Sequence, residues 1–155
     1  GYLRTESGMG ELSRSTARAL KAAGYPLTTV DVDDAPQRQF DLTLAHEDRG
    51  HPLPFTIVHM NAPEALLHAD RLASWREGRF PIGYWAWELA ELPDDWIEAF
   101  ALYREVWTCS THAATAIGRR SPVPVQAMWP ALPDALPSSL ARDHGSRKPS
   151  TRSST

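Results

Sequence analysis

The chain has 155 residues, of which 42% are hydrophobic and 23% charged, and its formal net charge is −3. This composition is typical of one globular domain and argues against a nucleic-acid-binding protein, which would carry an excess of basic residues. No apolar run approaches the roughly 20 residues of a membrane-spanning helix, and these residues show no basic-then-apolar leader. The single cysteine, Cys109, cannot form an internal disulfide. We therefore expect a cytoplasmic protein without an integral membrane segment.

The first expected element is a helix over residues 11–23, where apolar and small residues recur at helical spacing and Gly24 ends the run. A β-branched strand is expected over residues 27–33. The stretch from there to residue 54 is polar and rich in turn residues, which indicates a long loop or a weak edge strand over residues 40–44.

From residue 55 onward, apolar β-branched runs alternate with amphipathic runs. The expected strands cover residues 55–60, 79–87, 105–109 and 123–129. The expected helices cover residues 61–75, 93–103 and 110–120, with Asn61 and Ser110 as N-caps of the first and last. This alternation predicts a parallel sheet covered on both faces. The expected fold class is α/β, a Rossmann-like three-layer domain with a mostly parallel sheet whose first strand is truncated to residues 1–3.

The domain is expected to end at residue 133. Residues 134–155 are rich in Ser, Pro and Arg and hold almost no large apolar side chain. Such a segment buries too little surface to offset the entropy of ordering, so we expect a disordered tail.

Gly8 and Gly10 stand just before the first expected helix. Glycines there let the backbone turn tightly, and a helix N-terminus offers free N–H groups to an anion. Asp31 and Asp33 lie about 20 residues further on, where a ribose-binding acid of a dinucleotide site would be, but Ser13 replaces the third glycine of that fingerprint. The glycines therefore indicate either an anion-binding turn or only a tight turn.

Other candidate sites are weaker. His46 and His51 are five residues apart, and this spacing would turn two helical side chains away from one another, so no metal site is expected. Cys109 ends an apolar strand, where an inert buried thiol is expected. Arg119 and Arg120 are read as a solvated helix end that favours the helix dipole.

Residues 80–96 combine three tryptophans with acidic side chains. In an open α/β sheet, ligands bind beyond the carboxyl ends of the strands, and Glu88 follows such an end. Trp85 and Trp87 share one face of this strand and Tyr84 the other. Indole faces beside a carboxylate suit a sugar, although a purely structural core remains the alternative for Trp85.

Three stretches, residues 7–20, 83–96 and 105–117, together resemble the N-terminal domain of a group 1 (family 4) glycosyltransferase with the two-domain GT-B fold. They read SGMGELSRSTARAL, GYWAWELAELPDDW and EVWTCSTHAATAI. The resemblance implies retaining transfer of a hexose from a nucleotide-sugar donor to a sugar or glycan acceptor, with no cofactor and no essential metal. The N-terminal domain would serve mainly the acceptor, and a C-terminal domain would bind the nucleotide.

Carried over by residue, the resemblance puts Gly8 and Gly10 near the donor phosphates and Glu88 in the interdomain cleft. Because a carboxylate beside indoles suits a sugar, Glu88 is the candidate catalytic residue. The remaining candidate substrate-binding residues are Tyr84, Trp85, Trp87 and Ser110. The sequence departs from the family at Thr108-Cys109, where relatives read Val-Pro, and it lacks a pair of glutamates eight positions apart. We therefore expect a fragment that is inactive alone and pairs with a separately encoded C-terminal domain. The alternatives are a small nucleotide- or NAD-binding Rossmann protein and a non-catalytic α/β interaction module.

Overall fold

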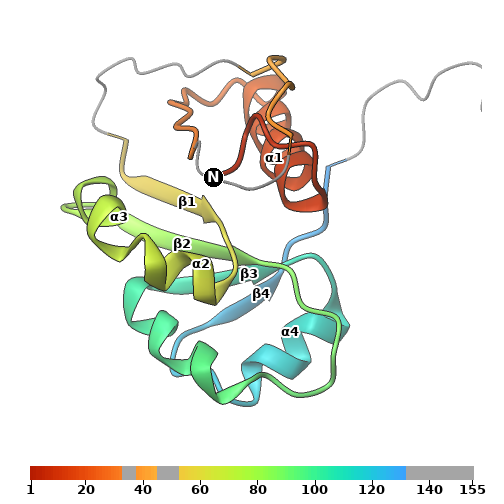
Figure 1. Cartoon of the computed structure of the whole chain (residues 1–155), viewed down its shortest axis with the longest axis vertical. Helices are drawn as coiled ribbons and strands as arrows, with labels where there is room; N and C mark the ends of the chain where they lie inside the picture. Colours follow the sequence, from red (N-terminus) through yellow and green to blue (C-terminus); the bar gives the residue numbers. More distant parts are fainter. Residues whose placement is uncertain (33–37, 45–52, 132–155) are drawn as a thin grey trace, which may run out of the picture.

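A computed structural model describes residues 1–32, 38–44 and 53–131 of the chain. The strands form one four-stranded sheet in which every strand is parallel to its neighbours and the spatial order follows the chain order (Figure 1). They are β1 (Phe55–His59), β2 (Phe80–Trp85), β3 (Glu105–Thr108) and β4 (Val125–Ala127). This arrangement confirms the α/β, Rossmann-like fold that the alternating pattern predicts.

Helices cover both faces of the sheet, as Figure 1 shows. Helix α1 (Gly8–Ala22) lies over β1 on one face. The elements of the other face are α2 (Ala62–Leu67), α3 (Ala69–Arg76), the 3-10 helix η1 (Asp94–Leu102) and α4 (Thr111–Gly118). None of these helices, within the ranges that the structure describes, is long and apolar enough to cross a membrane.

The strand expected over residues 27–33 is wrong as far as residue 32, because only an isolated bridge at Thr29 is found there and Asp33 lies outside the described residues. Gly1 lies beside this segment: its N–H donates to the Val30 carbonyl at 3.1 Å, and the Val32 N–H donates to the Gly1 carbonyl at 2.9 Å. These two bonds and the bridge at Thr29 do not extend into a regular strand. Residues 40–44 form no strand either.

The helix expected over residues 61–75 is divided into α2 and α3 at His68, whose backbone (φ −102°, ψ 15°) leaves the helical region. The division lets each short helix turn its own apolar residues inward, Ala65 from α2 and Leu72 from α3. Residues 94–102 form a 3-10 helix where a regular α-helix was expected. Helical periodicity does not distinguish these cases. Over a short run, roughly 3.0 and 3.6 residues per turn place nearly the same side chains on one face, and a break at one residue leaves the pattern on each side intact.

The centre of the core is Trp85, which is 0% exposed. Its ring lies 4.8 Å from that of Phe100 and 5.8 Å from that of Trp96, measured between centroids, and both partners belong to η1. Gly83 makes this packing possible, since a Cβ on it would lie 2.9 Å from the ring of Tyr103 and 3.1 Å from the indole nitrogen of Trp85. The aromatic cluster therefore holds η1 against the sheet.

Candidate functional site

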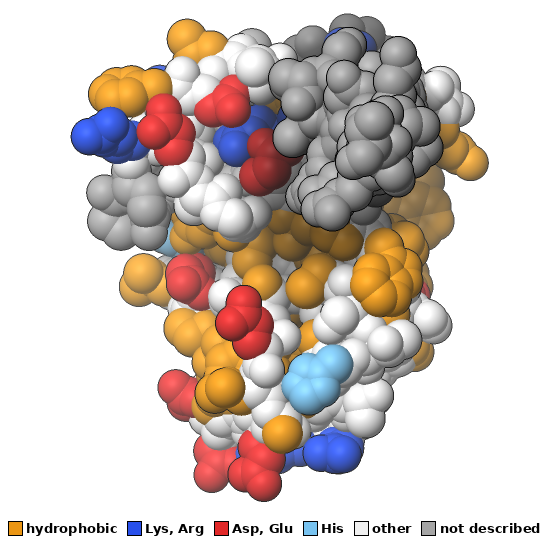
Figure 2. All heavy atoms as spheres, turned by 90° about the vertical axis from the view of Figure 1, so that its right-hand side faces the viewer, with side chains coloured by type: hydrophobic (Ala, Val, Ile, Leu, Met, Phe, Trp, Pro, Cys, Tyr) orange, Lys and Arg blue, Asp and Glu red, His pale blue; other side chains and the backbone are white. Residues whose placement is uncertain are grey.

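All four strands end at the same edge of the sheet because they are parallel. The segments that leave this edge carry most of the candidate residues, and Figure 2 looks onto it. Hydrophobic side chains gather in a hollow across the middle of this face (Figure 2). Two of the exposed apolar residues follow strands here, Leu89 after β2 and Trp129 after β4, at 64% and 66% exposure. We take this carboxyl edge as the candidate functional site.

Gly8 and Gly10 do not precede α1, as the sequence suggested, but form its first turn. Ser7 is the N-cap, and its Oγ accepts a hydrogen bond from the Gly10 N–H at 3.1 Å. A Cβ on Gly10 would lie 2.1 Å from the Thr5 carbonyl oxygen, whereas a Cβ on Gly8 would have no atom within 4 Å. Gly10 is thus required by the packing of the turn, and Gly8 leaves the end of the helix open. Helix geometry leaves the first N–H groups without a partner in the helix.

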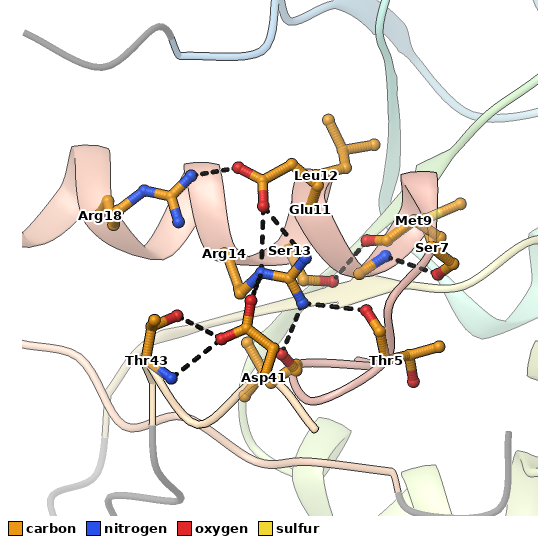
Figure 3. Close-up of polar contacts among 12 residues, drawn as sticks. Thr5, Ser7, Met9, Glu11, Leu12, Ser13, Arg14, Arg18, Asp41 and Thr43 are labelled. Atoms are coloured by element: carbon orange, nitrogen blue, oxygen red, sulfur yellow. Dashed lines mark hydrogen bonds and ion pairs between the residues drawn. The ribbon is translucent and has the colours of Figure 1, made fainter. Parts of the chain in front are cut away.

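The turn before α1 is held by Arg14, whose side chain is 6% exposed (Figure 3). Its Nη1 donates to the carbonyls of Leu3 and Thr5 at 2.9 and 3.0 Å. The guanidinium also pairs with Glu11 and with Asp41, each at 3.0 Å. Sequence reasoning missed this residue, because nothing in the local pattern shows that an arginine on α1 meets carbonyls of the preceding turn.

Through Asp41, Arg14 also anchors residues 38–44 beside the turn. The backbone N–H of Glu6 donates to the Arg38 carbonyl at 2.8 Å, and that of Asp41 to the Arg4 carbonyl at 3.2 Å. Hydrogen bonds from Thr43 lower the pKa of Asp41. Burial alone would raise the pKa of Glu11, but hydrogen bonds from Arg18 and Arg14 outweigh it and lower that pKa. Both carboxylates therefore stay ionised and paired near neutral pH.

The two adjacent aromatic candidates of β2 have packing roles. Tyr84 is 1% exposed, its ring stacks on that of His59 at 4.9 Å, and its hydroxyl donates to the Met128 carbonyl. Burial, and then the nearby Cys109, raise the pKa of Tyr84 to about 12. Trp85 points into the core from the opposite face of the strand. Neither ring presents a face to solvent at the candidate site.

Trp87 and Glu88 lie beyond the end of β2 in the segment that leads to η1. Trp87 is half-buried against Trp96, at 4.6 Å between ring centroids, and its indole N–H donates to the Glu91 carbonyl at 3.1 Å. Glu88 is exposed. A hydrogen bond holds the start of this segment in place: the Ala86 N–H donates to Oδ1 of Asn61 at 2.8 Å. Asn61 thus joins the ends of β1 and β2, and its side chain makes no capping hydrogen bond to α2.

Ser110 caps α4, as expected, with its Oγ accepting from the Ala113 N–H at 3.1 Å. Cys109, beside it, is half-buried. The structure thus brings the start of α1, Glu88 and Ser110 to one edge of the sheet on three separate elements (Figure 1). Among the described residues, no hydrogen bond or ion pair joins Gly8, Glu88 and Ser110. His46 and His51 lie outside the described residues, as does the tail from residue 134.

His59, at the end of β1, is buried beneath α1, and its Nε2 lies 3.0 Å from the hydroxyl of Thr16. That hydroxyl donates to the Leu12 carbonyl, so its oxygen accepts from the N–H of a neutral imidazole. Burial lowers the pKa of His59 from 6.5 to about 3. Protonation therefore favours the unfolded chain over the whole window between these two values.

We expect the free energy of unfolding to fall as the pH drops below 6.5, the ordinary value for this imidazole. Between pH 6.5 and pH 5.5 the protonation of His59 alone should lower it by about 1 kcal/mol. Urea denaturation of wild type and His59→Leu at these two pH values measures it. The loss in the variant should be smaller than in wild type by this amount, and a slope from the buried Gly1 amine, whose pKa burial lowers to about 5, should remain in both. His112→Asn, at an exposed position, is the matched control and should keep the full loss of wild type. Equal pH slopes for wild type and His59→Leu would show that His59 is not buried neutral.

Within the described ranges, no cluster of three or more His, Cys, Asp or Glu residues could hold a metal ion. No protein-family model matches this chain, and neither a curated protein nor a solved structure matches it. The features of this chain that bear on function are therefore those of the carboxyl edge: the open first turn of α1, the exposed Glu88 and the capped start of α4.

Proposed function

We propose that this chain is the N-terminal domain of a glycosyltransferase that transfers a hexose from a nucleotide-sugar donor to a sugar or glycan acceptor. The described residues amount to one α/β domain, so the proposal includes a donor-binding domain, on the same or a separate chain, that closes over the carboxyl edge. In this proposal, the chain contributes an anion-binding helix terminus and the groups that receive the acceptor.

The observation that carries the proposal is the open first turn of α1. The space around Gly8 is free, Ser7 fixes the start of the helix, and Arg14 holds the turn from behind. The N-terminus of a helix concentrates free N–H groups and the positive end of the helix dipole, which together suit a phosphate. A pyrophosphate approaching this edge would contact the backbone at Gly8 without displacing a side chain.

Glu88 and Trp87 support the acceptor half of the proposal. Glu88 is exposed beyond the end of β2, so its carboxylate is available to a hydroxyl donor. The indole of Trp87 is half-buried and fixed by its hydrogen bond to the Glu91 carbonyl. A fixed indole edge beside a carboxylate offers a sugar both an apolar surface and an acceptor. We assign Glu88 the role of orienting or deprotonating the acceptor hydroxyl, as a general base does.

The test is an NMR titration of the 155-residue chain with inorganic pyrophosphate, UDP, GDP and NAD at millimolar concentration. We expect pyrophosphate and the nucleoside diphosphates to shift the backbone amides of Gly8 and Met9. In Gly8→Glu, the added carboxylate should weaken this binding by about tenfold, a charge effect of roughly 1.4 kcal/mol at close range. The substitution should not harm the fold, because an acid in a first helical turn is favourable.

Gly8→Gln is the matched control, since it fills the same space without the charge. It should weaken binding less than Gly8→Glu does. If none of the anions shifts the amides at the start of α1, this turn does not bind anions and its proposed role is wrong. Shifts with NAD but not with UDP or GDP would favour the dinucleotide-binding alternative.

A further inference from the structure

A second hollow lies on the outer side of α4, against the chain that follows β2. It has a volume of about 380 Å³ and is open to solvent. Its lining consists of Ala90, Thr111, His112, Thr115, Ala116 and Arg119. This volume falls within the range of about 300–1,000 Å³ that small-molecule sites occupy. Sequence reasoning missed this site, because its two walls come from segments that are far apart in the chain.

One wall is a polar stripe along α4. Thr111, Thr115 and Arg119 are spaced by four residues, so they share one exposed face of the helix and its C-cap. The opposite wall is the segment at Ala90, which runs beside α4 in Figure 1. The Nη1 of Arg119 donates to the Ala90 carbonyl at 3.3 Å and so joins the two walls. Ala90 and Ala116 leave the space between them open because their side chains are small.

Arg119 is the chemical centre of the hollow. Its neighbour Arg120 pairs with Asp94 and also donates to the Leu92 carbonyl, whereas Arg119 forms no ion pair within the described residues. Most of its guanidinium donors are therefore available, in the planar geometry that binds phosphate or carboxylate through two hydrogen bonds.

The remaining lining suits a sugar. The hydroxyl of Thr115 donates to the Thr111 carbonyl at 2.9 Å, so its oxygen can accept a further hydrogen bond. Thr111 and His112 add polar groups at the start of α4, and the two alanines add an apolar surface. Hydroxyl partners, a small apolar floor and an unpaired cation match a monosaccharide that carries one anionic group.

We infer that the hollow at α4 is an acceptor subsite for a sugar bearing a phosphate or a carboxylate, with the anionic group on Arg119. The inference rests on the proposed function. The link between the hollow and the proposed active site is Glu88, which lies two residues before Ala90 in the same segment. A sugar seated here with its anionic group at Arg119 directs its hydroxyls along α4 toward the carboxyl edge.

NMR titration of the full chain with glucose 6-phosphate, glucuronate and glucose tests the inference. We expect the two anionic sugars to shift the amides from Thr111 to Arg119, and glucose to bind there at least about tenfold more weakly. Arg119→Gln should reduce the affinity for the anionic sugars by about tenfold, and Arg119→Lys should restore part of it. Arg104→Gln, an exposed arginine at the opposite edge of the sheet, is the matched control and should bind like wild type.

The glucose 6-phosphate and glucuronate titrations distinguish the two sources of charge, and tighter binding of either supports the inference. Equal binding of all three sugars, an Arg119→Gln variant that binds like wild type, or inorganic phosphate that binds as tightly as glucose 6-phosphate would overturn it. Sugar binding is measured by amide shifts at α4, and pyrophosphate binding by amide shifts at α1. Failure of this subsite and failure of the proposed function are therefore separate outcomes.

Discussion

Trp85→Ala is expected to lower the free energy of unfolding by about 3–5 kcal/mol, the usual cost of truncating a buried aromatic side chain. Trp85 is fully buried and contacts the rings of Trp96, Phe100 and Tyr103. Its removal would leave a cavity between β2 and η1 that neighbouring rings cannot close without moving the helix. Urea denaturation at neutral pH measures the loss, and Phe100→Ala should give a loss of similar size from the other side of the same contact.

Trp129→Ala is the control, because that tryptophan lies at the exposed carboxyl edge. It should change stability by no more than about 0.5 kcal/mol, as surface substitutions usually do. A loss below about 1 kcal/mol for Trp85→Ala would mean that η1 does not pack on the sheet, and the assignment of the aromatic cluster to the core would be wrong.

Arg14→Met should cost about 3–5 kcal/mol, the range seen when one partner of a buried charged network is removed. The methionine fills much of the same volume, but the carbonyls of Leu3 and Thr5 lose their donor and Asp41 loses its cation. We expect the turn before α1 and residues 38–44 to separate first, since Arg14 joins them. Hydrogen exchange should show this as faster exchange of the backbone amides of Glu6 and Asp41.

Arg18→Ala is the matched control on the same helix. Arg18 pairs with Glu11 at the surface, with both side chains about half-exposed, so its loss should cost less than about 1 kcal/mol. Unchanged exchange at Glu6 and Asp41 in Arg14→Met would contradict the role of Arg14 in holding the turn.

The aromatic run shows where sequence reasoning about the site stops. Topology alone places Glu88 beyond the end of β2, because parallel strands share one carboxyl edge. Because neighbouring residues of a strand point to opposite faces, Tyr84 and Trp85 must lie on opposite faces of the sheet. This alternation does not tell which of the two side chains is buried. In the structure both faces are covered, by His59 and α1 on one side and by η1 on the other. Of the three ring candidates, only Trp87 therefore keeps an exposed part at the edge.

The sequence by itself determined the local features whose cause is local. Apolar runs of strand length specify β1 to β4, the Ser110 hydroxyl specifies the start of α4, and Gly24 ends α1 because its φ of +77° favours glycine. The alternation of these elements was sufficient for the α/β class.

Tertiary structure decided the features whose partners are distant in the chain. Arg14 is buried only because carbonyls of the preceding turn and Asp41 surround it. The segment over 27–32 forms an isolated bridge at Thr29 and two hydrogen bonds with Gly1 in place of a regular strand. The hollow at α4 exists because Ala90 and Ala116, from two elements distant in the chain, line one open space. A side chain's burial and its partners are set by long-range packing, and no local pattern contains that information.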